Sequence, residues 1–514
     1  CKINIFVLLS PCVCFIFYQK RNFMKSNIYT LIIFALVFLA ASLTKAQQNW
    51  RSLMHNPSAN FFAIQDSFEQ EFEGLPYQKG LGIKQFRRWE YYWQGRVDEN
   101  GNFPAPGNVL SEMYRYYDSH TESRNYLNGS GNWSLLGPVD KPQNGTGQPN
   151  GNGRLNCIAF DPVDPNTLYV GAPSGGFWKS TNNGQSWSQY VTGLTRLGIS
   201  SIVVHPNNTN IIYIGTGDRD GGDAPGYGVW QSTDGGLTWA AHNSGMGNRT
   251  VNEIVMDPNN PNILIAITNN RIYRTTNGGA NWTQVFSGHN CKDIAMHPGN
   301  SNILYAAGTN FYRSIDNGQS WTQITAGVPT GVQRLALAVS ANQPNYIYIL
   351  AGDGSGLVAL SRSTNSGASF NTRSNSPNIL GYSNTGNDNN SQAWYDLVLA
   401  ANPLNANEIY VAGVNIWKST DGGQNWSIVA HWTGSGADDV HADHHALEFS
   451  PHNNTLYNGN DGGIYQTTNA GTNWNELSSG LYIAQIYKIG TSQQNQDKVI
   501  NGYQDNGTSI NIGS

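Results

Sequence analysis

Residues 232–239 read STDGGLTW, one of seven copies of the pattern Ser/Thr-x-Asp/Asn-x-Gly-x-x-Trp/Phe, which we call the box. In this pattern Asp or Asn accepts backbone N–H bonds and supports a tight turn, and Gly permits a positive φ. The aromatic residue is expected to anchor the turn between neighbouring sheets. The copies start at Ser180, Ser232, Thr275, Ser314, Ser363, Ser419 and Thr467, at intervals of 39 to 56 residues. Intervals of this size are typical of propeller blades, so we interpret the boxes as folding devices rather than catalytic motifs.

A longer repeating unit surrounds each box. In the first unit, short strands are expected at 158–160, 168–171 and 177–180, and a fourth begins at the box Trp187. Four short strands per 40 to 50 residues make one blade. The sequence therefore predicts an all-β fold, a β-propeller of four-stranded blades with seven boxed blades and a partial eighth.

The partial eighth unit begins at Ile483, with strands expected at 485–489 and 499–502, and it reaches Ser514 without a box. One interpretation is that residues 132–136 supply its fourth strand and close an eight-bladed ring. The other, which we favour, is that the sequence is truncated at its C-terminus.

Composition supports a β-rich fold. The 514 residues include 57 Gly, 15 Trp and 26 Tyr, and only 12% are charged, which favours short strands and tight turns over long solvated helices. A formal net charge of −5 argues against a nucleic-acid partner. Beyond residue 46 the cysteines are Cys157 and Cys291, which lie in different repeats, so no disulfide is expected.

The N-terminal region divides into three segments before the propeller, which we place at 126–514. Residues 1–23 precede Met24 and read as upstream, untranslated or extra sequence. Residues 24–46 read as a signal peptide, with an apolar run over 28–43 that is shorter than the roughly 20 residues of a membrane span. Residues 47–125 are expected to form amphipathic helices, since apolar side chains recur at helical spacing from Phe61 to Phe72 and from Phe86 to Trp93. We therefore expect a secreted or cell-surface bacterial protein with no stable membrane span after cleavage.

The box resembles the Asp-box, or BNR, repeat, and the resemblance covers roughly residues 150–480. Sialidases, xyloglucan-active glycoside hydrolases, sortilin-type receptors and a photosystem II assembly factor carry this repeat, and all are β-propellers. The resemblance implies a secreted propeller similar to the sortilin and xyloglucan-active superfamily. The Arg-Ile-Pro element of sialidases is absent from the sequence. Xyloglucan-active enzymes typically place an Asp before the Gly-Gly of the first blade, whereas here 171–176 read GAPSGG; Asp461, before Gly462-Gly463, is a similar element in another blade.

The candidate site follows from the geometry of a propeller. Turns between the second and third strands share one face with the starts of the first strands, and such variable loops on a rigid frame commonly bind ligands. Acidic and aromatic residues collect there, a combination that suits carbohydrate. The candidate catalytic residues are Asp396, Asp443, Asp461 and Asp505, two of which would form the acid/base pair of a glycosidase. The candidate ligand-binding residues are Arg154, Arg334, Trp394, Tyr395, His441 and Tyr503.

Two metal hypotheses are weaker. Asp218, Asp220 and Asp223 alternate with glycines in one loop and are calcium candidates, although an ordinary solvated turn is the favoured interpretation. His441, Asp443 and His445 fall on one side of a strand, and three ligands from one strand make poor geometry for a transition metal. We expect no other cofactor.

Two functions are consistent with these residues. The first is a monomeric recognition propeller whose loop face binds a glycan or an extracellular protein. The alternative is a xyloglucanase-like glycoside hydrolase that acts on a plant or algal polysaccharide through a pair of Asp residues. Proteins with this fold perform both functions, so the residues of the site, and not the fold, must distinguish between them.

Overall fold

The computed structural model describes residues 50–54, 56, 59–74, 81–104, 135, 137, 140, 150–495 and 498–511. The chain divides into two compact units, Cys1–Gly74 and Leu75–Ser514. The predicted upstream segment, the predicted signal peptide and most of residues 132–136 lie outside the described residues. Within the described ranges, no helix has the length and apolar character needed to cross a membrane.

Within its described residues, the smaller unit contains the helices α2 (Trp50–Leu53) and α3 (Phe61–Phe72). The side chain of Asn60 caps α3 by accepting the backbone N–H groups of Phe62 at 3.0 Å and Ala63 at 3.3 Å. Phe61, Ile64 and Phe68 are buried on one face. The helix predicted from the spacing of the phenylalanines is confirmed.

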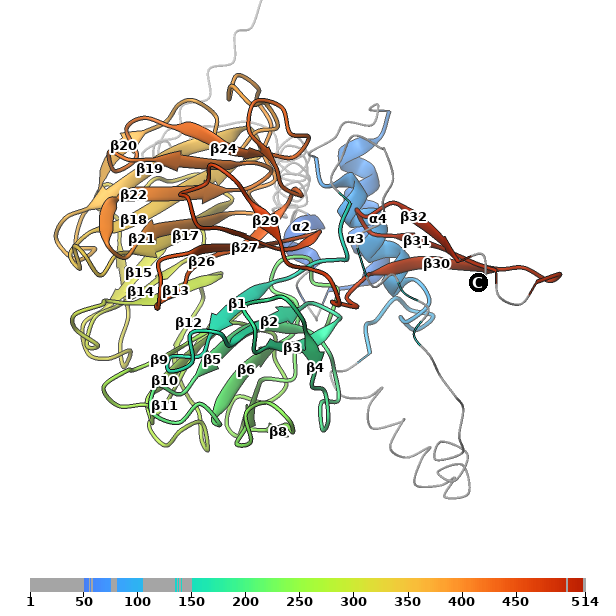
Figure 1. Cartoon of the computed structure of the whole chain (residues 1–514), viewed down its shortest axis with the longest axis horizontal. Helices are drawn as coiled ribbons and strands as arrows, with labels where there is room; N and C mark the ends of the chain where they lie inside the picture. Colours follow the sequence, from blue (N-terminus) through green and yellow to red (C-terminus); the bar gives the residue numbers. More distant parts are fainter. Residues whose placement is uncertain are drawn as a thin grey trace, which may run out of the picture. The chain divides into compact units, whose positions relative to one another are not determined.

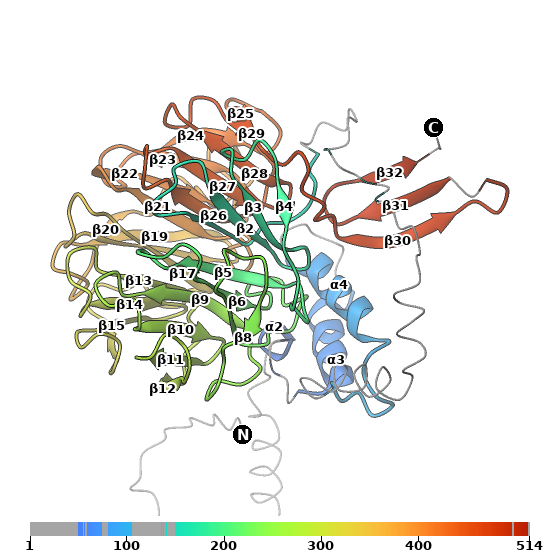
Figure 2. The same cartoon turned by 60° about the horizontal axis from the view of Figure 1, so that its bottom comes forward.

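The larger unit holds seven antiparallel sheets that form the blades (Figures 1 and 2). Blade 1 is β1 (Cys157–Phe160), β2 (Leu168–Ala172), β3 (Gly176–Ser180) and β4 (Ser188–Gln189). Blade 2 is β5 (Ile199–Val204), β6 (Ile212–Thr216), β7 (Val229–Ser232) and β8 (Ala240–Ala241). Blade 3 is β9 (Val251–Met256), β10 (Leu264–Thr268), β11 (Arg271–Thr275) and β12 (Thr283–Ser287). Blade 4 is β13 (Asp293–Met296), β14 (Leu304–Ala307), β15 (Phe311–Ser314) and β16 (Thr322–Ile324).

The remaining blades follow the same order. Blade 5 is β17 (Arg334–Val339), β18 (Ile347–Asp353), β19 (Gly356–Ser363) and β20 (Asn371–Ser374). Blade 6 is β21 (Val398–Asn402), β22 (Asn405–Ala412), β23 (Ile416–Ser419) and β24 (Ser427–His431), and the short β25 (Asp438–Asp439) pairs parallel to β24. Blade 7 is β26 (His444–Phe449), β27 (Leu456–Asn460), β28 (Gly463–Thr467) and β29 (Asn475–Glu476). The β-propeller predicted from the box repeat is confirmed.

The ring closes between blade 7 and blade 1. Each first strand contacts the first strand of the next blade, and β1 contacts β26. The backbone N–H of Leu155 donates to Asn460 at 3.0 Å, and that of Asn152 donates to Gly462 at 2.8 Å. One apolar cluster joins the two blades and includes Val170 and Ile464. The eighth unit is therefore not needed for closure.

The partial eighth unit forms a separate three-stranded sheet of β30 (Ile486–Thr491), β31 (Val499–Tyr503) and β32 (Thr508–Asn511). Figures 1 and 2 show it outside the ring, beside the helix α4 (Ile83–Trp93). In α4, Phe86 and Trp89 are buried, as their helical spacing predicts, whereas Lys84, Arg87 and Tyr91 are exposed. This helix thus presents a cationic face with a tyrosine.

All seven boxes form the same set of hydrogen bonds. In blade 2 the Ser232 hydroxyl donates to Asp234 at 2.7 Å and accepts the N–H of Gly236 at 2.8 Å, while Asp234 accepts the N–H of Thr238 at 2.9 Å. The residue before the Gly that all boxes share has a positive φ; it is Gly in three boxes and Asn183, Asn317, Ser366 and Ala470 in the others. The tight turn expected from the motif is present.

The box tryptophans connect successive blades. The indole N–H of Trp282 in blade 3 donates to the His242 carbonyl of blade 2 at 2.8 Å. The indole of Trp187 in blade 1 reaches the Leu477 carbonyl, which follows β29 of blade 7, also at 2.8 Å. Cys157 and Cys291 are both free thiols, as expected from their positions in different repeats.

We predict that Trp282→Ala lowers the free energy of unfolding by about 3–5 kcal/mol, the usual cost of emptying a buried tryptophan site. Trp282 is only 3% exposed, whereas Leu237, within another box, is 50% exposed. Leu237→Ala is the control and should stay within about 0.5 kcal/mol of the parent. Urea unfolding followed by tryptophan fluorescence measures both; equal small effects would show that the box aromatic does not hold the blades together.

Candidate functional site

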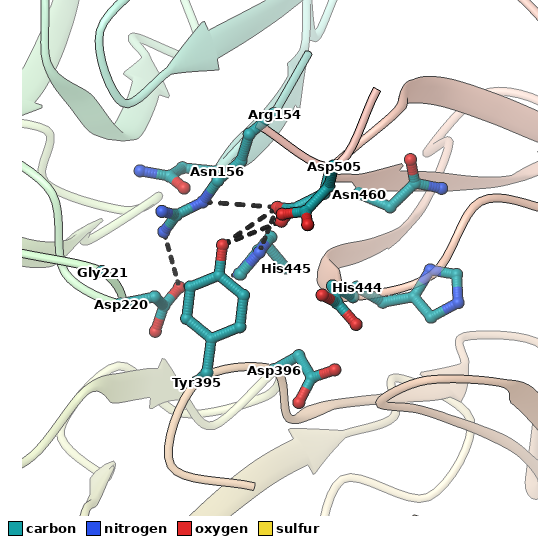
Figure 3. Close-up of polar contacts among 12 residues, drawn as sticks. Arg154, Asn156, Asp220, Gly221, Tyr395, Asp396, His444, His445, Asn460 and Asp505 are labelled. Atoms are coloured by element: carbon teal, nitrogen blue, oxygen red, sulfur yellow. Dashed lines mark hydrogen bonds and ion pairs between the residues drawn. The ribbon is translucent and has the colours of Figure 1, made fainter. Parts of the chain in front are cut away.

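A buried arginine organises the centre of one propeller face (Figure 3). Arg154 lies just before β1 and is 1% exposed. Its Nη2 and Nη1 donate to the two carboxylate oxygens of Asp218 at 2.7 and 3.2 Å, and its Nε lies 3.8 Å from Asp461. The guanidinium also lies 4.9 Å from the centre of the Tyr395 ring. One side chain therefore joins blades 1, 2 and 7 and the loop before blade 6.

Asp220 contacts a second group of side chains, which includes two cations and a histidine. Arg334 Nη1 lies 2.9 Å from its Oδ1, Lys292 Nζ lies 3.4 Å from the same oxygen, and His445 Nδ1 lies 3.2 Å from Oδ2. Burial alone would raise the pKa of Asp220, but Arg334, Arg219 and Lys292 hold it well below its ordinary value. Asp220 therefore stays charged, and its contacts with Lys292, Arg334 and His445 hold together the starts of β13, β17 and β26.

Three carboxylates meet beside this network. Asp443 precedes β26, Asp461 lies in the β27–β28 turn and Asp505 lies in the β31–β32 turn. One oxygen from each lies within 4.8 Å of the other two. We call these three residues the carboxylate cluster.

Asp461 is held rigidly in the cluster. The Tyr395 hydroxyl donates to both of its oxygens, at 2.9 and 3.1 Å, and His445 Nε2 lies 3.0 Å from Oδ1. Both Tyr395 and Asp461 are 1% exposed. Hydrogen bonds from two buried side chains therefore fix the position of Asp461 in the cluster.

Asp505 is held in its charged form by helix α4. Arg88 Nη2 lies 2.9 and 3.0 Å from its two oxygens, and Lys84 Nζ contacts Oδ1. Burial opposes ionisation, yet Arg88 and Lys84 lower the pKa of Asp505 below its ordinary value. Asp505 is thus ionised throughout the neutral and mildly acidic range.

Asp443 has the opposite environment. Burial and the neighbouring charges of Asp461 and Asp505 raise its pKa to about 6. The Gln392 amide donates to Asp443 at 2.8 Å and lies 3.5 Å from Asp396, which is 1% exposed. Burial and the charge of Asp443 raise the pKa of Asp396 well above its ordinary value. Asp396 and Asp443 therefore retain protons at pH values where Asp505 has lost its proton.

Two residues of this cluster have a left-handed backbone, as several residues of the box turns also do. Asp443 and Asp505 adopt φ values of +63° and +53°. Asp tolerates this left-handed region better than most residues, but it is sparsely populated outside glycine, and such residues concentrate at functional sites. In both cases the strained residue is one of the clustered carboxylates.

The other predicted ligand-binding residues divide into two groups. His441 Nε2 lies 3.3 Å from the Asp505 carbonyl, so His441 borders the cluster. Trp394 is half-buried, its ring packs against Tyr395 at 5.4 Å between ring centres, and its carbonyl accepts from Lys292 at 3.3 Å. The Tyr503 side chain instead accepts from Asn501 at 3.2 Å within the separate sheet. Both ring nitrogens of His445 contact carboxylates, of Asp220 and Asp461.

Oxygen spacing in the carboxylate cluster suits a single Ca²⁺, which takes oxygen ligands at about 2.3–2.6 Å. Arg88 and Lys84 already balance the charge of Asp505 there. In the 218–223 loop, Asp218 binds Arg154, and burial beside Asp218 raises the pKa of Asp223 to about 6. An ion in that loop would have to compete with the guanidinium groups of Arg154 and Arg334, so the geometry favours ion pairs over calcium there.

Several residues of the site were not predicted from the sequence. Arg88, Lys84 and Gln392 all contact clustered carboxylates, and Lys292 contacts Asp220. The sequence did contain a pattern that could have revealed Lys84 and Arg88. Together with Arg87 and Tyr91 they recur at spacings of 3, 1 and 3, which place them on one face of a helix. That face lies opposite Phe86 and Trp89.

Comparison with known proteins gives partial matches. The Sortilin-Vps10 family model (sortilin, neurotensin receptor 3) matches residues 270–399. A xyloglucanase of Acetivibrio thermocellus is 29% identical over 171 residues, which cover 26% of this chain and 20% of that protein. A xyloglucanase of Paenibacillus sp is 26% identical over 241 residues, covering 38% of this chain and 22% of that protein.

The chain is similar to the sortilin and xyloglucanase propellers. A crystal structure of an ancestral GH74 enzyme superposes with a TM-score of 0.54 at 17% identity, covering 73% of this chain and 55% of that one. The GH74 xyloglucanase of Xanthomonas campestris gives a TM-score of 0.54 at 17% identity, covering 70% of this chain and 59% of that one. These superpositions show the shared fold, and this chain spans little more than half of each enzyme.

We predict that Asp396→Asn flattens the pH dependence of stability. The folded pKa of Asp396 lies above its unfolded value, so its contribution is complete below about pH 4 and is lost as pH rises towards the folded pKa. One such proton changes the slope by up to about 1.4 kcal/mol per pH unit. Thermal unfolding at pH 5 and pH 8 should show a smaller loss of Tm in Asp396→Asn than in the parent. Asp353→Asn, at the C-terminal end of β18, is the control; parallel slopes for parent and Asp396→Asn would contradict the buried protonated carboxyl.

We predict that EDTA leaves Tm unchanged relative to added calcium, because Arg154 and Arg334 already neutralise Asp218 and Asp220. Differential scanning fluorimetry compares the two conditions. A calcium-dependent rise in Tm that Asp223→Asn abolishes would place an ion in the 218–223 loop. A rise abolished only by Asp505→Asn would place it in the carboxylate cluster.

Proposed function

We propose that this protein is a glycoside hydrolase acting on an extracellular polysaccharide, with Asp443 as proton donor and Asp505 as its ionised partner. One observation carries the proposal: two carboxyl groups with oxygens within 4.8 Å have environments that move their pKa values in opposite directions. Such pairs are the usual mark of acid and base assignments in an active site.

The two roles match the chemistry of glycoside cleavage. The leaving oxygen needs a proton from a carboxyl group whose pKa is raised, and the sugar ring acquires positive charge that an ionised carboxylate stabilises. Asp443 supplies the first group and Asp505 the second. Asp461, fixed by Tyr395 and His445, maintains the negative field that keeps the proton on Asp443.

Position and resemblance support a polysaccharide substrate. Asp443 is partly exposed, and Trp394, whose ring packs against Tyr395, is half-buried and offers an aromatic face of the kind that stacks on a sugar. The relatives that align with this chain are named xyloglucanases, so xyloglucan is the first substrate to test. The expected setting is extracellular, with the chain acting as a monomer after removal of residues 24–46; N-terminal sequencing and light scattering of the secreted protein test both expectations.

Glycan recognition without hydrolysis is the second proposal. It draws on the first-blade turn around 171–176, which lacks the carboxylate that xyloglucan-active enzymes typically carry there. The two proposals differ in one observable, the appearance of cleaved product.

We predict that the protein releases oligosaccharides from a polysaccharide panel that begins with xyloglucan, read by mass spectrometry. Asp443→Asn should lower kcat by about 10²–10⁴-fold, because removing a positioned general acid costs that much. Asp505→Asn should also lower kcat, and Asp353→Asn should not. Tight binding without product from any polymer of the panel would favour recognition, and product from Asp443→Asn at the parental rate would exclude Asp443 as the acid.

We predict that kcat falls as pH rises above about 6. The pKa of Asp443 is raised to about 6, so its proton is present below that pH and is lost above it. Arg88→Gln should move the falling limb to higher pH, because Asp505 then loses a compensating cation and repels the ionised form of Asp443 more strongly. Initial rates from pH 4 to 9 provide the test; a limb that does not move in Arg88→Gln would contradict the coupling.

A further inference from the structure

A groove of about 290 Å³ lies beside the carboxylate cluster, between helix α4 and strand β30. Four cations and two tyrosines line it: Lys84, Arg87, Arg88, Tyr91, Tyr487 and Lys488. Figures 1 and 2 show α4 and the β30–β32 sheet side by side. The groove is therefore built from two elements far apart in the sequence.

The groove carries excess positive charge on a chain whose net charge is −5. Lys84 and Arg88 face Asp505, and Arg87 pairs with Glu90 at 2.9 Å. Lys488 forms no ion pair with any residue that the structure describes, and its ammonium lies 6.0 Å from the centre of the Tyr91 ring. Among the described residues, Lys84 and Arg88 share the single carboxylate of Asp505 and Lys488 adds a further charge, which leaves cationic capacity for an anionic ligand.

The tyrosines supply flat faces next to these cations. Tyr91 is 52% exposed, and the Arg88 guanidinium lies 5.6 Å from the centre of the Tyr487 ring. Aromatic faces stack on the C–H faces of sugar rings, while Arg and Lys bind carboxylate or sulfate oxygens. A neutral sugar would use the rings and leave the cations unmatched.

Arg88 and Lys84 line the groove and also bind Asp505, so the groove and the carboxylate cluster share a wall. We propose that the groove binds an acidic sugar unit of the substrate, one that carries a carboxylate or a sulfate group, and so selects acidic polysaccharides. The placement of that unit next to the cleaved bond rests on the proposed function. The binding claim itself rests on the groove.

The test uses the whole chain in affinity electrophoresis and calorimetry with three polymers: polygalacturonate, a sulfated galactan and neutral xyloglucan. At low salt we expect at least one acidic polymer to bind more tightly than xyloglucan, with an affinity that falls as NaCl increases. Preference for polygalacturonate indicates a uronate ligand, and preference for the galactan indicates a sulfate ligand. Equal or weaker binding of both acidic polymers would overturn the proposal.

Matched variants separate the groove from general charge effects. Lys488→Glu and Tyr91→Ala should each weaken binding of the acidic polymer by about tenfold or more, the loss expected for a desolvated charge-assisted contact or a stacked ring. Lys498→Glu, an equal charge change at an exposed lysine that directly precedes β31 and does not line the groove, should leave affinity unchanged. Equal losses in Lys488→Glu and Lys498→Glu would overturn the assignment of the groove.

Failure of the groove proposal is distinguishable from failure of the proposed function. Product from xyloglucan that depends on Asp443, without tighter binding of acidic polymers, would overturn the groove and leave hydrolysis standing. Groove-dependent binding of an acidic polymer that is never cleaved would support the groove and count against hydrolysis.

Discussion

Closure of the ring by box tryptophans is the constraint on which the rest of this protein depends. Each blade alone is a short twisted sheet with two apolar faces, and it becomes stable only when neighbours cover both. The indole of Trp187 reaches back to the Leu477 carbonyl, so blade 1 covers blade 7 in the same way that other blades cover their predecessors. The apolar clusters therefore lie between blades, and the axis is left to polar groups.

That arrangement explains the electrostatics of the site. The starts of the first strands converge at one end of the axis, and there Arg154 and Arg334 balance Asp218 and Asp220 within a buried network. The carboxylate cluster lies at the edge of this network, where some carboxylates contact cations and others do not. Asp505 lies against Arg88 and Lys84, whereas Asp443 accepts a hydrogen bond from the neutral Gln392 amide and faces the charges of Asp461 and Asp505, and this imbalance separates their pKa values.

The fold was predictable because each box specifies both a turn and a contact between blades. Its hydroxyl, its carboxylate or amide and its glycine, at fixed spacing, determine the turn, and its aromatic ring makes the contact with the neighbouring blade. The four candidate aspartates were identified because propeller geometry sends strand starts and particular turns to a common face. Sequence alone could not supply the distances among Asp443, Asp461 and Asp505, which depend on how three loops fold against one another. Nor did it reveal the contribution of α4, because the aromatic face of Phe86 and Trp89 suggested only packing, while the opposite face supplies the cations that ionise Asp505.

The central claim is that two adjacent carboxyl groups hold opposite protonation states, and direct titration tests it. The parent, Asp443→Asn and Asp505→Asn proteins would be labelled with ¹³C at the aspartate carboxyl carbons and followed by NMR from pH 3 to 8. We expect the signal missing from Asp443→Asn to titrate near pH 6 in the parent, while the signal missing from Asp505→Asn shows an ionised carboxylate over most of that range. Titration of both groups together near the ordinary aspartate pKa of about 4 would contradict the claim.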